Sequence, residues 1–247
     1  MFQVGRVHEI VRYPVKSMAG IRVPSANLGW HGLDGDRRFA FRRVGNQSGN
    51  PWLSASALPE LLRYHPVGND ESPGEPIPTL VRTPSGVDRA VGSPELDAEI
   101  SELYGSPVEL TRLSHGIFDE AAISVISLTT IAGIGREAGG ELDRRRFRAN
   151  IVVETERADP FLEDDWVGGM LVFGEGDSGP AVAVTLRDLR CMMVNLDPDS
   201  AHQDPRVMKA VVRLNGNYAG VYGAVVRTGP VRPGDRVHLV PAPPLAP

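Results

Sequence analysis

The sequence predicts a mainly β protein with peripheral helices, an α+β fold built from two packed barrel-like units. Two observations carry this prediction. Turn-forming residues are plentiful, with 27 glycines and 21 prolines, and they separate short apolar runs. Only three segments show the pattern of a helix. A content of 41% hydrophobic and 23% charged residues is typical of a folded globular protein.

Short strand-like runs fill the first third of the chain. Val4–Tyr13 alternates loosely before Pro14 interrupts it, and Ile21–Val23 and Phe39–Phe41 are further strand candidates. The stretch 66–78 is acidic, rich in proline and glycine, and lacks periodicity, so we expect an exposed loop there. Leu80–Thr83 then resumes the strand pattern.

Three segments are predicted to be helices. The strongest, 204–216, has an aspartate cap, a proline in its first turn and a terminating glycine. The segment 93–105 has a serine cap, an apolar stripe and a final glycine. The third begins at Thr129 or Thr130, ends at Gly139, and is weakened by two internal glycines.

The second half returns to strands. The candidates are Ile151–Val153, Met170–Phe173, Ala181–Leu186, Gly220–Arg227 and Arg236–Val240. A boundary placed after the 93–105 helix divides the chain into a smaller N-terminal unit, 1–106, and a larger unit, 107–247.

Charge and hydropathy exclude several classes of partner. The formal net charge of −5 does not favour a nucleic-acid backbone, so any bound anion must be held by local basic groups. No apolar run is long enough to cross a bilayer, and the first residues lack the apolar core of a signal peptide. We therefore expect a cytoplasmic protein that binds neither nucleic acid nor membrane.

The chain has a single cysteine, Cys191. One thiol forbids an internal disulfide and cannot hold an iron–sulfur cluster alone. The six histidines show no close ligand spacing, so a histidine metal site is not expected. The ordinary interpretation of a lone cysteine is a small buried hydrophobe.

Two nucleotide-binding motifs are matched only in part. Gly174–Gly179 fits G-x-G-x-x-G, but Pro180 and a strand-like run follow it instead of a helix, which favours a hairpin loop. Lys16-Ser17 resembles the end of a phosphate-binding loop, but Ile10 and Val15 stand where that loop needs glycines.

Polar or reactive residues interrupt strand-like runs in four places: Tyr13–Ser17, Gly35–Phe39, Arg144–Asn150 and Leu189–Asp197. Each has an ordinary interpretation when taken singly. The first would be a solvated turn, the second a set of surface ion pairs, and the third a solvated basic face. Cys191 in the fourth would fill the core.

Taken together these segments resemble one family. YPVKSMAG, DGDRRF, RFRANIVV, LRCMMVNLDP and GVYGAVVRTGPVRPGDRV, in this order, are similar to MOSC-domain proteins with an N-terminal MOSC β-barrel domain. The resemblance runs from about Val7 to Leu239 and implies the barrel domain at 1–106 and the MOSC domain at 107–247. The family takes its name from the C-terminal domain of molybdenum-cofactor sulfurases. It includes the mitochondrial amidoxime-reducing components and bacterial proteins that detoxify hydroxylated bases.

The resemblance implies a pterin molybdenum cofactor, with Cys191 as the catalytic residue whose thiolate ligates the metal. Residues at matching positions are implied to bind the pterin and its phosphate: Lys16, Ser17, Arg37, Arg148 and Asn150. Arg190, Ser127 and Thr129 are further cofactor-binding candidates. Met192 and Met193 stand where the family often has threonines, which puts substrate selectivity in doubt.

The implied activity is reduction of small N-hydroxylated substrates, from N–OH to an amine or amidine. Because a single cysteine cannot hold an iron–sulfur cluster, we expect no ferredoxin domain here, and electrons would come from a separate donor protein of the ferredoxin, flavodoxin or cytochrome type. Two alternatives remain open at this point. The protein could carry the cofactor without turnover, or Cys191 could carry a persulfide for sulfur transfer.

Overall fold

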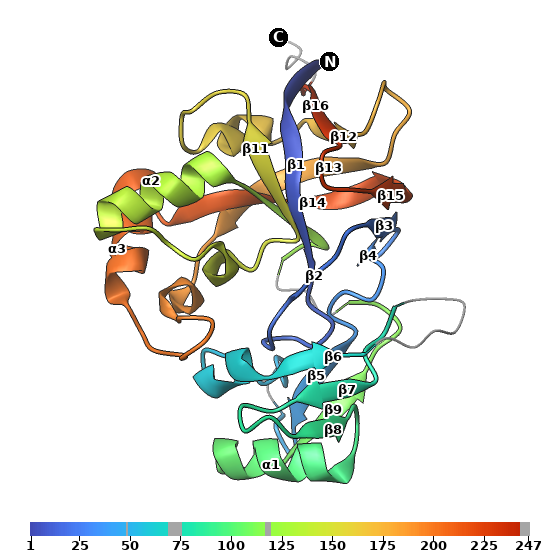
Figure 1. Ribbon diagram of the computed structural model, residues 1–247, viewed down its shortest axis with the longest axis vertical. Helices are drawn as coiled ribbons and strands as arrows, with labels where there is room; N and C mark the ends of the chain where they lie inside the picture. Colours follow the sequence, from blue (N-terminus) through green and yellow to red (C-terminus); the bar gives the residue numbers. More distant parts are fainter. Residues whose placement is uncertain (48, 69–75, 117–119, 243–247) are drawn as a thin grey trace.

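The computed structural model of the chain describes residues 1–47, 49–68, 76–116 and 120–242. Within these ranges strands dominate and three α-helices lie at the periphery, which confirms the predicted mainly β class (Figure 1). A larger β-barrel lies above a smaller unit in the view of Figure 1, and the chain passes between them more than once.

Seven strands close into the barrel. Their order is β11-β10-β14-β13-β12-β16-β1, and pairing of β11 with β1 closes the ring. The strands are β1 (Phe2–Arg12), β10 (Ile123–Ser127), β11 (Ile151–Thr155), β12 (Met170–Phe173), β13 (Ala181–Leu189), β14 (Tyr218–Arg227) and β16 (Arg236–Val240). The short β2 (Ile21–Arg22) pairs with the end of β1. β10 and β11 run parallel, with Val125 opposite Ile151 and Ser127 opposite Val153.

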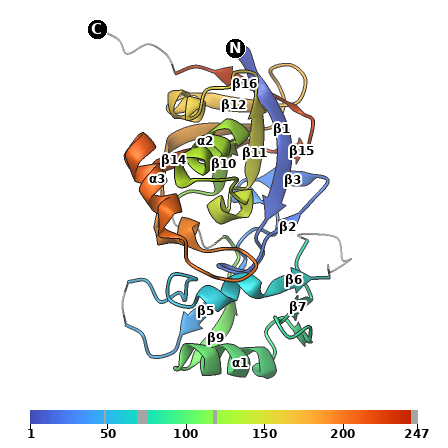
Figure 2. The same ribbon diagram turned by 60° about the vertical axis from the view of Figure 1, so that its left-hand side comes forward.

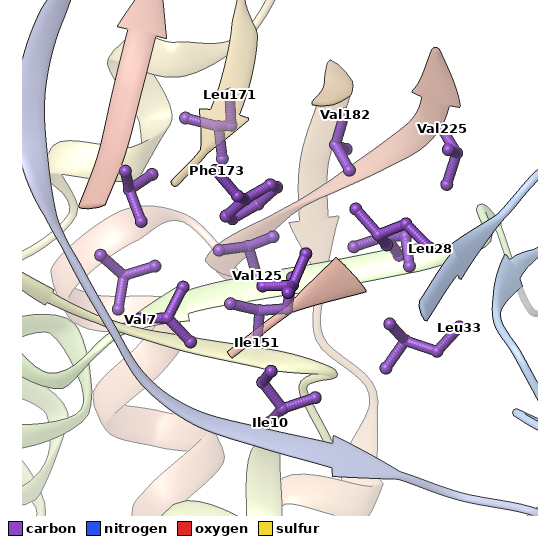
Figure 3. Close-up of a cluster of buried hydrophobic side chains, with 14 of the residues drawn as sticks. Val7, Ile10, Leu28, Leu33, Val125, Ile151, Leu171, Phe173, Val182 and Val225 are labelled. Carbon is purple, nitrogen blue, oxygen red and sulfur yellow. The ribbon is translucent and has the colours of Figure 1, made fainter. Parts of the chain in front are cut away.

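Aliphatic side chains fill the barrel. Figure 3 shows Val7, Ile10, Val125, Ile151 and Phe173 converging on its interior, and all five are buried. A three-stranded sheet of β3 (Ala26–Gly29), β4 (Gly32–Leu33) and β15 (Gly229–Val231) adds further apolar residues to this core. Burial of this area is the main stabilising term of the barrel.

The smaller unit, drawn below the barrel in Figure 2, has a core of its own, which includes Phe41, Leu61, Leu96 and Ile100. Two sheets surround it, one of β5 (Phe39–Arg43) and β9 (Val108–Arg112), the other of β6 (His65–Val67), β7 (Leu80–Arg82) and β8 (Asp88–Ala90). The helix α1 (Pro94–Tyr104) and the 3₁₀ turn η1 (Pro59–Arg63) cover them.

The chain crosses between the two units early and late. β1 to β4, from the range 1–106, lie in or beside the barrel, whereas β9, from the range 107–247, pairs with β5 of the smaller unit. The division at 106/107 stays a prediction.

The predicted helix signals are found at the helix ends. Ser93 caps α1 and Asp204 caps α3 (Pro205–Asn215), each accepting a hydrogen bond from a backbone N–H of the first turn. α2 (Leu128–Ala138) starts slightly earlier than expected because the Ser127 hydroxyl caps it. Its internal Gly135 allows close packing, since a Cβ there would lie 2.6 Å from the Gly140 carbonyl oxygen.

One predicted loop is shorter than expected. Within 66–78, Pro66 and Val67 belong to strand β6, where they pair with Val81 and Leu80. Residues 69–75 of that prediction lie outside the described residues. The glycine-rich segment 174–179 connects β12 to β13, as predicted for a hairpin loop. Among the described residues, no helix has the length and apolar character needed to span a membrane.

Candidate functional site

Three of the predicted site residues share an unusual backbone conformation. Ser17, Arg37 and Arg148 have φ angles of 69°, 48° and 51°, in the left-handed region. For residues other than glycine this conformation costs on the order of 1 kcal/mol each. Ser17 and Arg37 lie in turns, and Arg148 follows a 3₁₀ turn as its C-cap. The surrounding structure therefore holds the chain in bends that present these side chains.

Tyr13 joins two of these turns. Its backbone N–H donates to Asp36 Oδ1 at 2.6 Å, and its carbonyl oxygen accepts from the backbone N–H of Arg37 at 2.7 Å. The guanidinium carbons of Arg37 and Arg148 lie 5.0 and 4.4 Å from the centre of its ring. Burial raises the pKa of Tyr13 to about 12 against the opposing effect of these cations.

Asn150 immediately precedes β11 and connects Arg37 to the strands of the barrel. Its Oδ1 accepts from the Ser124 backbone N–H at 3.1 Å and from Arg37 Nη1 at 3.3 Å. Its Nδ2 donates to the Val11 carbonyl oxygen at 3.3 Å. Arg37 Nη2 also donates to the Arg148 carbonyl oxygen at 3.3 Å. The structure thus brings Arg37, Arg148 and Asn150 together, and we call these three residues with Tyr13 the cationic cluster.

Arg37 keeps its positive charge in this partly buried position. Burial is the largest single effect and acts against the charged form, but the buried carboxylate of Asp36 together with Tyr222 and Tyr13 outweighs it and raises the pKa of Arg37. A permanent cation is therefore held beside Tyr13 and Asn150.

Lys16 and Ser17 lie in the neighbouring turn, and both are buried. The Lys16 backbone N–H donates to the Phe39 carbonyl oxygen at 2.7 Å, which connects this turn to the smaller unit. Arg148 Nη1 donates to the carbonyl oxygen of Met18, the next residue along, at 2.8 Å. The turn therefore adjoins the Arg37–Arg148 pair.

Cys191 is exposed, so its interpretation as core filling is wrong. It follows β13 and precedes the 3₁₀ turn η4 (Met192–Asn195). A thiol in this position is accessible to a ligand. Among the described residues no group of three or more histidine, cysteine, aspartate or glutamate side chains could hold a metal ion. A metal at Cys191 would therefore need ligands from outside this set.

Arg190 links Cys191 to the cationic cluster. Its Nε donates to the Ala219 carbonyl oxygen and its Nη1 to the Phe147 carbonyl oxygen, both at 2.7 Å. Its Nη2 lies 2.8 Å from Asp188 Oδ2, which accepts from Ser124 Oγ at 3.1 Å. With the bond from Ser124 N–H to Asn150, a continuous polar chain joins the residue before Cys191 to Arg37.

Sequence reasoning did not select Ser124 or Asp188. Both are buried and both belong to this polar chain. Ser124 lies three residues before Ser127 in the sequence, and only the pairing of Val125 with Ile151 shows that Ser124 is the serine beside Asn150.

Ser127 and Thr129 are not brought into the cluster. Ser127 Oγ donates to Glu163 Oε2 at 2.9 Å, and its backbone N–H donates to Glu163 Oε1 at 3.2 Å. Thr129 Oγ1 lies 3.0 Å from Ser127 Oγ and 3.2 Å from Thr155 Oγ1. These groups satisfy one another at the opposite end of β10 from Ser124. Their role as cofactor ligands stays a prediction.

A cavity of about 650 Å³ lies beside the cluster, lined by both units. Among the predicted site residues only Arg148 lines it, together with Tyr13. Met193, one of the two methionines that depart from the family pattern, also lies on its wall. The remaining wall combines arginines with three acidic residues, a histidine and apolar side chains: Arg22, Arg144, Arg145, Arg146, Glu9, Glu141, Asp143, His65, Val11, Leu62, Leu142 and Leu196.

Among the comparisons with solved structures, the one with YuaD shows a shared fold. The YuaD protein from Bacillus subtilis is 16% identical, with 98% of this chain and 100% of that chain covered and a TM-score of 0.53. YiiM from Escherichia coli is 13% identical over 95% of this chain and 69% of that chain, with a TM-score of 0.43. YiiM from Geobacillus stearothermophilus is 20% identical over 53% of this chain and 63% of that chain, with a TM-score of 0.37.

No curated protein matches the chain significantly. Family profiles do match it. The profile described as the MOSC N-terminal beta barrel domain matches residues 4–69, and the profile described as the MOSC domain matches residues 112–238, about half of the chain. Together with the barrel architecture, these matches show that the chain belongs to the MOSC-domain family.

Proposed function

We propose that this protein binds a pterin molybdenum cofactor through Cys191 and the cationic cluster, and that it reduces N-hydroxylated compounds. The observation that carries the proposal is the polar chain from Arg190 through Asp188, Ser124 and Asn150 to Arg37. It connects the segment that carries the exposed thiol of Cys191 to Arg37, whose guanidinium lies beside the buried ring of Tyr13.

The chemistry of the available groups suits such a cofactor. A thiolate is a soft donor of the kind that completes a sulfur-rich metal site. Guanidinium groups bind phosphate through paired N–H donors, and a lysine adds a compact charge. Cys191 would hold the metal, while Lys16, Ser17, Arg37, Arg148 and Asn150 would hold the pterin and its phosphate. A chain of net charge −5 thus keeps a local cationic group for an anionic ligand.

When bound, the cofactor supplies two-electron exchange of an oxo group, which the removal of oxygen from N–OH requires. The chain itself contributes binding and orientation. Arg37 and Arg148 neutralise the anion, and their contacts with Tyr13 and Asn150 fix where they point. The neighbouring cavity, with Met193 and Leu196 on its wall, would hold the organic part of the substrate.

The overall reaction consumes two electrons and two protons and releases the amine or amidine with water. A separate donor protein would deliver the electrons. A reducing compartment such as the cytoplasm would keep Cys191 as a thiol, and we place the protein there as part of the proposal.

The test compares wild type with Cys191→Ala, both purified from a host that makes the cofactor. We expect molybdenum in the wild type, and reduction of a simple amidoxime with a reduced viologen as donor. The variant should lose both while keeping its circular dichroism spectrum and melting temperature.

Three results would contradict the proposal. The first is equal turnover in both proteins. The second is bound cofactor without turnover under any donor, which supports a carrier. The third is a persulfide on Cys191 in a protein without molybdenum, which supports sulfur transfer.

A further inference from the structure

The segment that carries Cys191 is held by the run of arginines before β11. We call residues 190–199 the cysteine loop, and the 3₁₀ turn η2 (Arg144–Phe147) the arginine turn. The sequence alone suggested a solvated basic face for these arginines. In the structure they contact carboxylates and carbonyl oxygens, several of which belong to the cysteine loop.

Contacts with the arginine turn lie on both sides of Cys191. Before it, Arg190 Nη1 donates to the Phe147 carbonyl oxygen at 2.7 Å. After it, Arg146 Nη1 donates to the Asn195 carbonyl oxygen at 2.8 Å, and Arg146 Nη2 donates to Asp197 Oδ2 at 3.0 Å. Cys191 therefore lies in a segment that is tied down at both ends to the same turn.

Burial decides which of these contacts matter most. The Arg146 side chain is 10% exposed and that of Asp197 is 33% exposed, so the bonds of Arg146 to the loop are partly shielded from water and salt. Arg145 also pairs with Asp199, but these side chains are 46% and 66% exposed. An exposed pair of this kind contributes little. Arg146 is therefore the main tie on the far side of Cys191.

The groups that Arg146 contacts are themselves anchored. The Asn195 carbonyl oxygen also accepts from the Asp204 backbone N–H at 2.8 Å, and Asn195 Oδ1 accepts from the Met208 backbone N–H at 2.9 Å. Asp197 Oδ1 accepts from the backbone N–H and the hydroxyl of Ser200. Arg146 thus joins the arginine turn to a loop end that is already fixed on α3.

The arginine turn is in turn fixed to the barrel and to the cationic cluster. Arg144 Nη2 donates to Glu9 Oε2 of β1 at 2.6 Å. Arg148 follows the turn as its C-cap, and its guanidinium lies over the ring of Tyr13. Any contact that fixes the cysteine loop to this turn also fixes the separation between Cys191 and Arg148.

We propose that Arg146 is a positioning residue that sets where Cys191 lies relative to the cationic cluster. The inference rests on the proposed function, because a fixed thiol position matters only for a ligand that Cys191 and the cationic cluster bind at the same time. Arg190 performs the matching task on the other side of Cys191, through the Phe147 carbonyl oxygen.

The first experiment measures amide hydrogen exchange in protein made by a host that lacks the cofactor. In Arg146→Ala the amides of Val194, Leu196 and Asp197 should exchange at least about ten-fold faster than in wild type. Arg146→Lys, which keeps one charged donor, should lie between the two. The control is Arg82→Ala, which removes an exposed ion pair with Asp88 in the smaller unit and should leave the loop unchanged.

The second experiment measures molybdenum retained by the same variants from a cofactor-competent host after extensive dialysis. We expect several-fold less metal in Arg146→Ala, an intermediate content in Arg146→Lys, and wild-type content in Arg82→Ala. If Arg146→Ala does not fold, Arg146→Lys carries both measurements.

Unchanged loop exchange in the folded variants would overturn the inference whatever the metal content. Faster exchange with undiminished molybdenum would also overturn it, since the loop position would then not matter to the ligand. A wild-type protein without molybdenum would refute the proposed function instead, and exchange in the cofactor-free protein would still show whether Arg146 fixes the loop.

Discussion

The two ends of the parallel strands β10 and β11 use similar residues in different ways. At one end, Ser124 and Asn150 connect outward to Arg37 and, through Asp188, to Arg190. At the other, Ser127, Thr129 and Glu163 bond mainly among themselves. Only the first end is joined to charged groups beside a cavity.

The two ends differ in whether their polar groups bond only to one another or leave charged groups available for a ligand. The end with Glu163 is a closed network, in which the carboxylate caps the first turn of α2 together with Ser127. Such a network stabilises the fold. The end with Asn150 arranges cations that keep their charge, which suits a bound anion. A hydroxyl near a motif that resembles a family's is therefore informative only when its hydrogen-bond partners are known.

The largest expected effect comes from breaking the closed end. Glu163→Ala removes the acceptor of the Ser127 N–H and hydroxyl inside the protein, and should lower the free energy of unfolding by about 3 kcal/mol. Urea denaturation measures this loss. Glu163→Gln keeps an acceptor and should cost less. Molybdenum content per folded chain should not change, and a selective loss of metal would show that this end belongs to the site.

A smaller effect is expected from the ionisation of Tyr13 at the open end. Its pKa is raised by burial to about 12, whereas an unfolded tyrosine ionises near 10. Its contribution is therefore complete below pH 10 and is lost as the pH rises through 12, by about 2 kcal/mol at pH 12. Stability measured between pH 9 and 12 in wild type and Tyr13→Phe checks this, because the variant should lack that part of the decline. Identical curves would contradict the assignment.

The smallest effect gives the sharpest contrast between the two ends. Ser127→Ala and Ser124→Ala each remove one buried hydroxyl and should each cost about 1 kcal/mol of stability. Only Ser124→Ala breaks the chain to Asp188, so only this variant should retain less molybdenum. Elemental analysis beside thermal unfolding compares the pair. Equal retention in both variants would remove the proposed distinction.

The sequence predicted the elements better than their partners. Ser93, Asp204 and Gly105 mark helix ends through local bonds between neighbours, so a single sequence is enough to find them. The choice between Ser124 and Ser127 depends instead on which strand lies beside β10 and in what register. Long-range pairing of this kind leaves no local signal.

The arginine run shows the same limit from another side. The adjacent arginines 144–146 pair with different carboxylates. Arg144 pairs with Glu9, Arg145 with Asp143 and Asp199, and Arg146 with Asp197. The charge of the run alone cannot distinguish a solvated basic face from a buried arginine that connects two segments, because the distinction depends on the burial of each side chain. Family resemblance supplied Arg37, Arg148 and Asn150, but it could not reveal Arg146.

Closure of the barrel has a consequence for how the protein folds. β1 pairs with β16, whose residues are synthesised more than two hundred positions later. During translation β1 can pair with β11 once residues 151–155 are made, but its other edge stays unpaired until β16 leaves the ribosome, and contacts so distant in sequence form slowly. The smaller unit, whose strands and helix all lie between residues 39 and 112, can fold first and cover part of the unpaired chain.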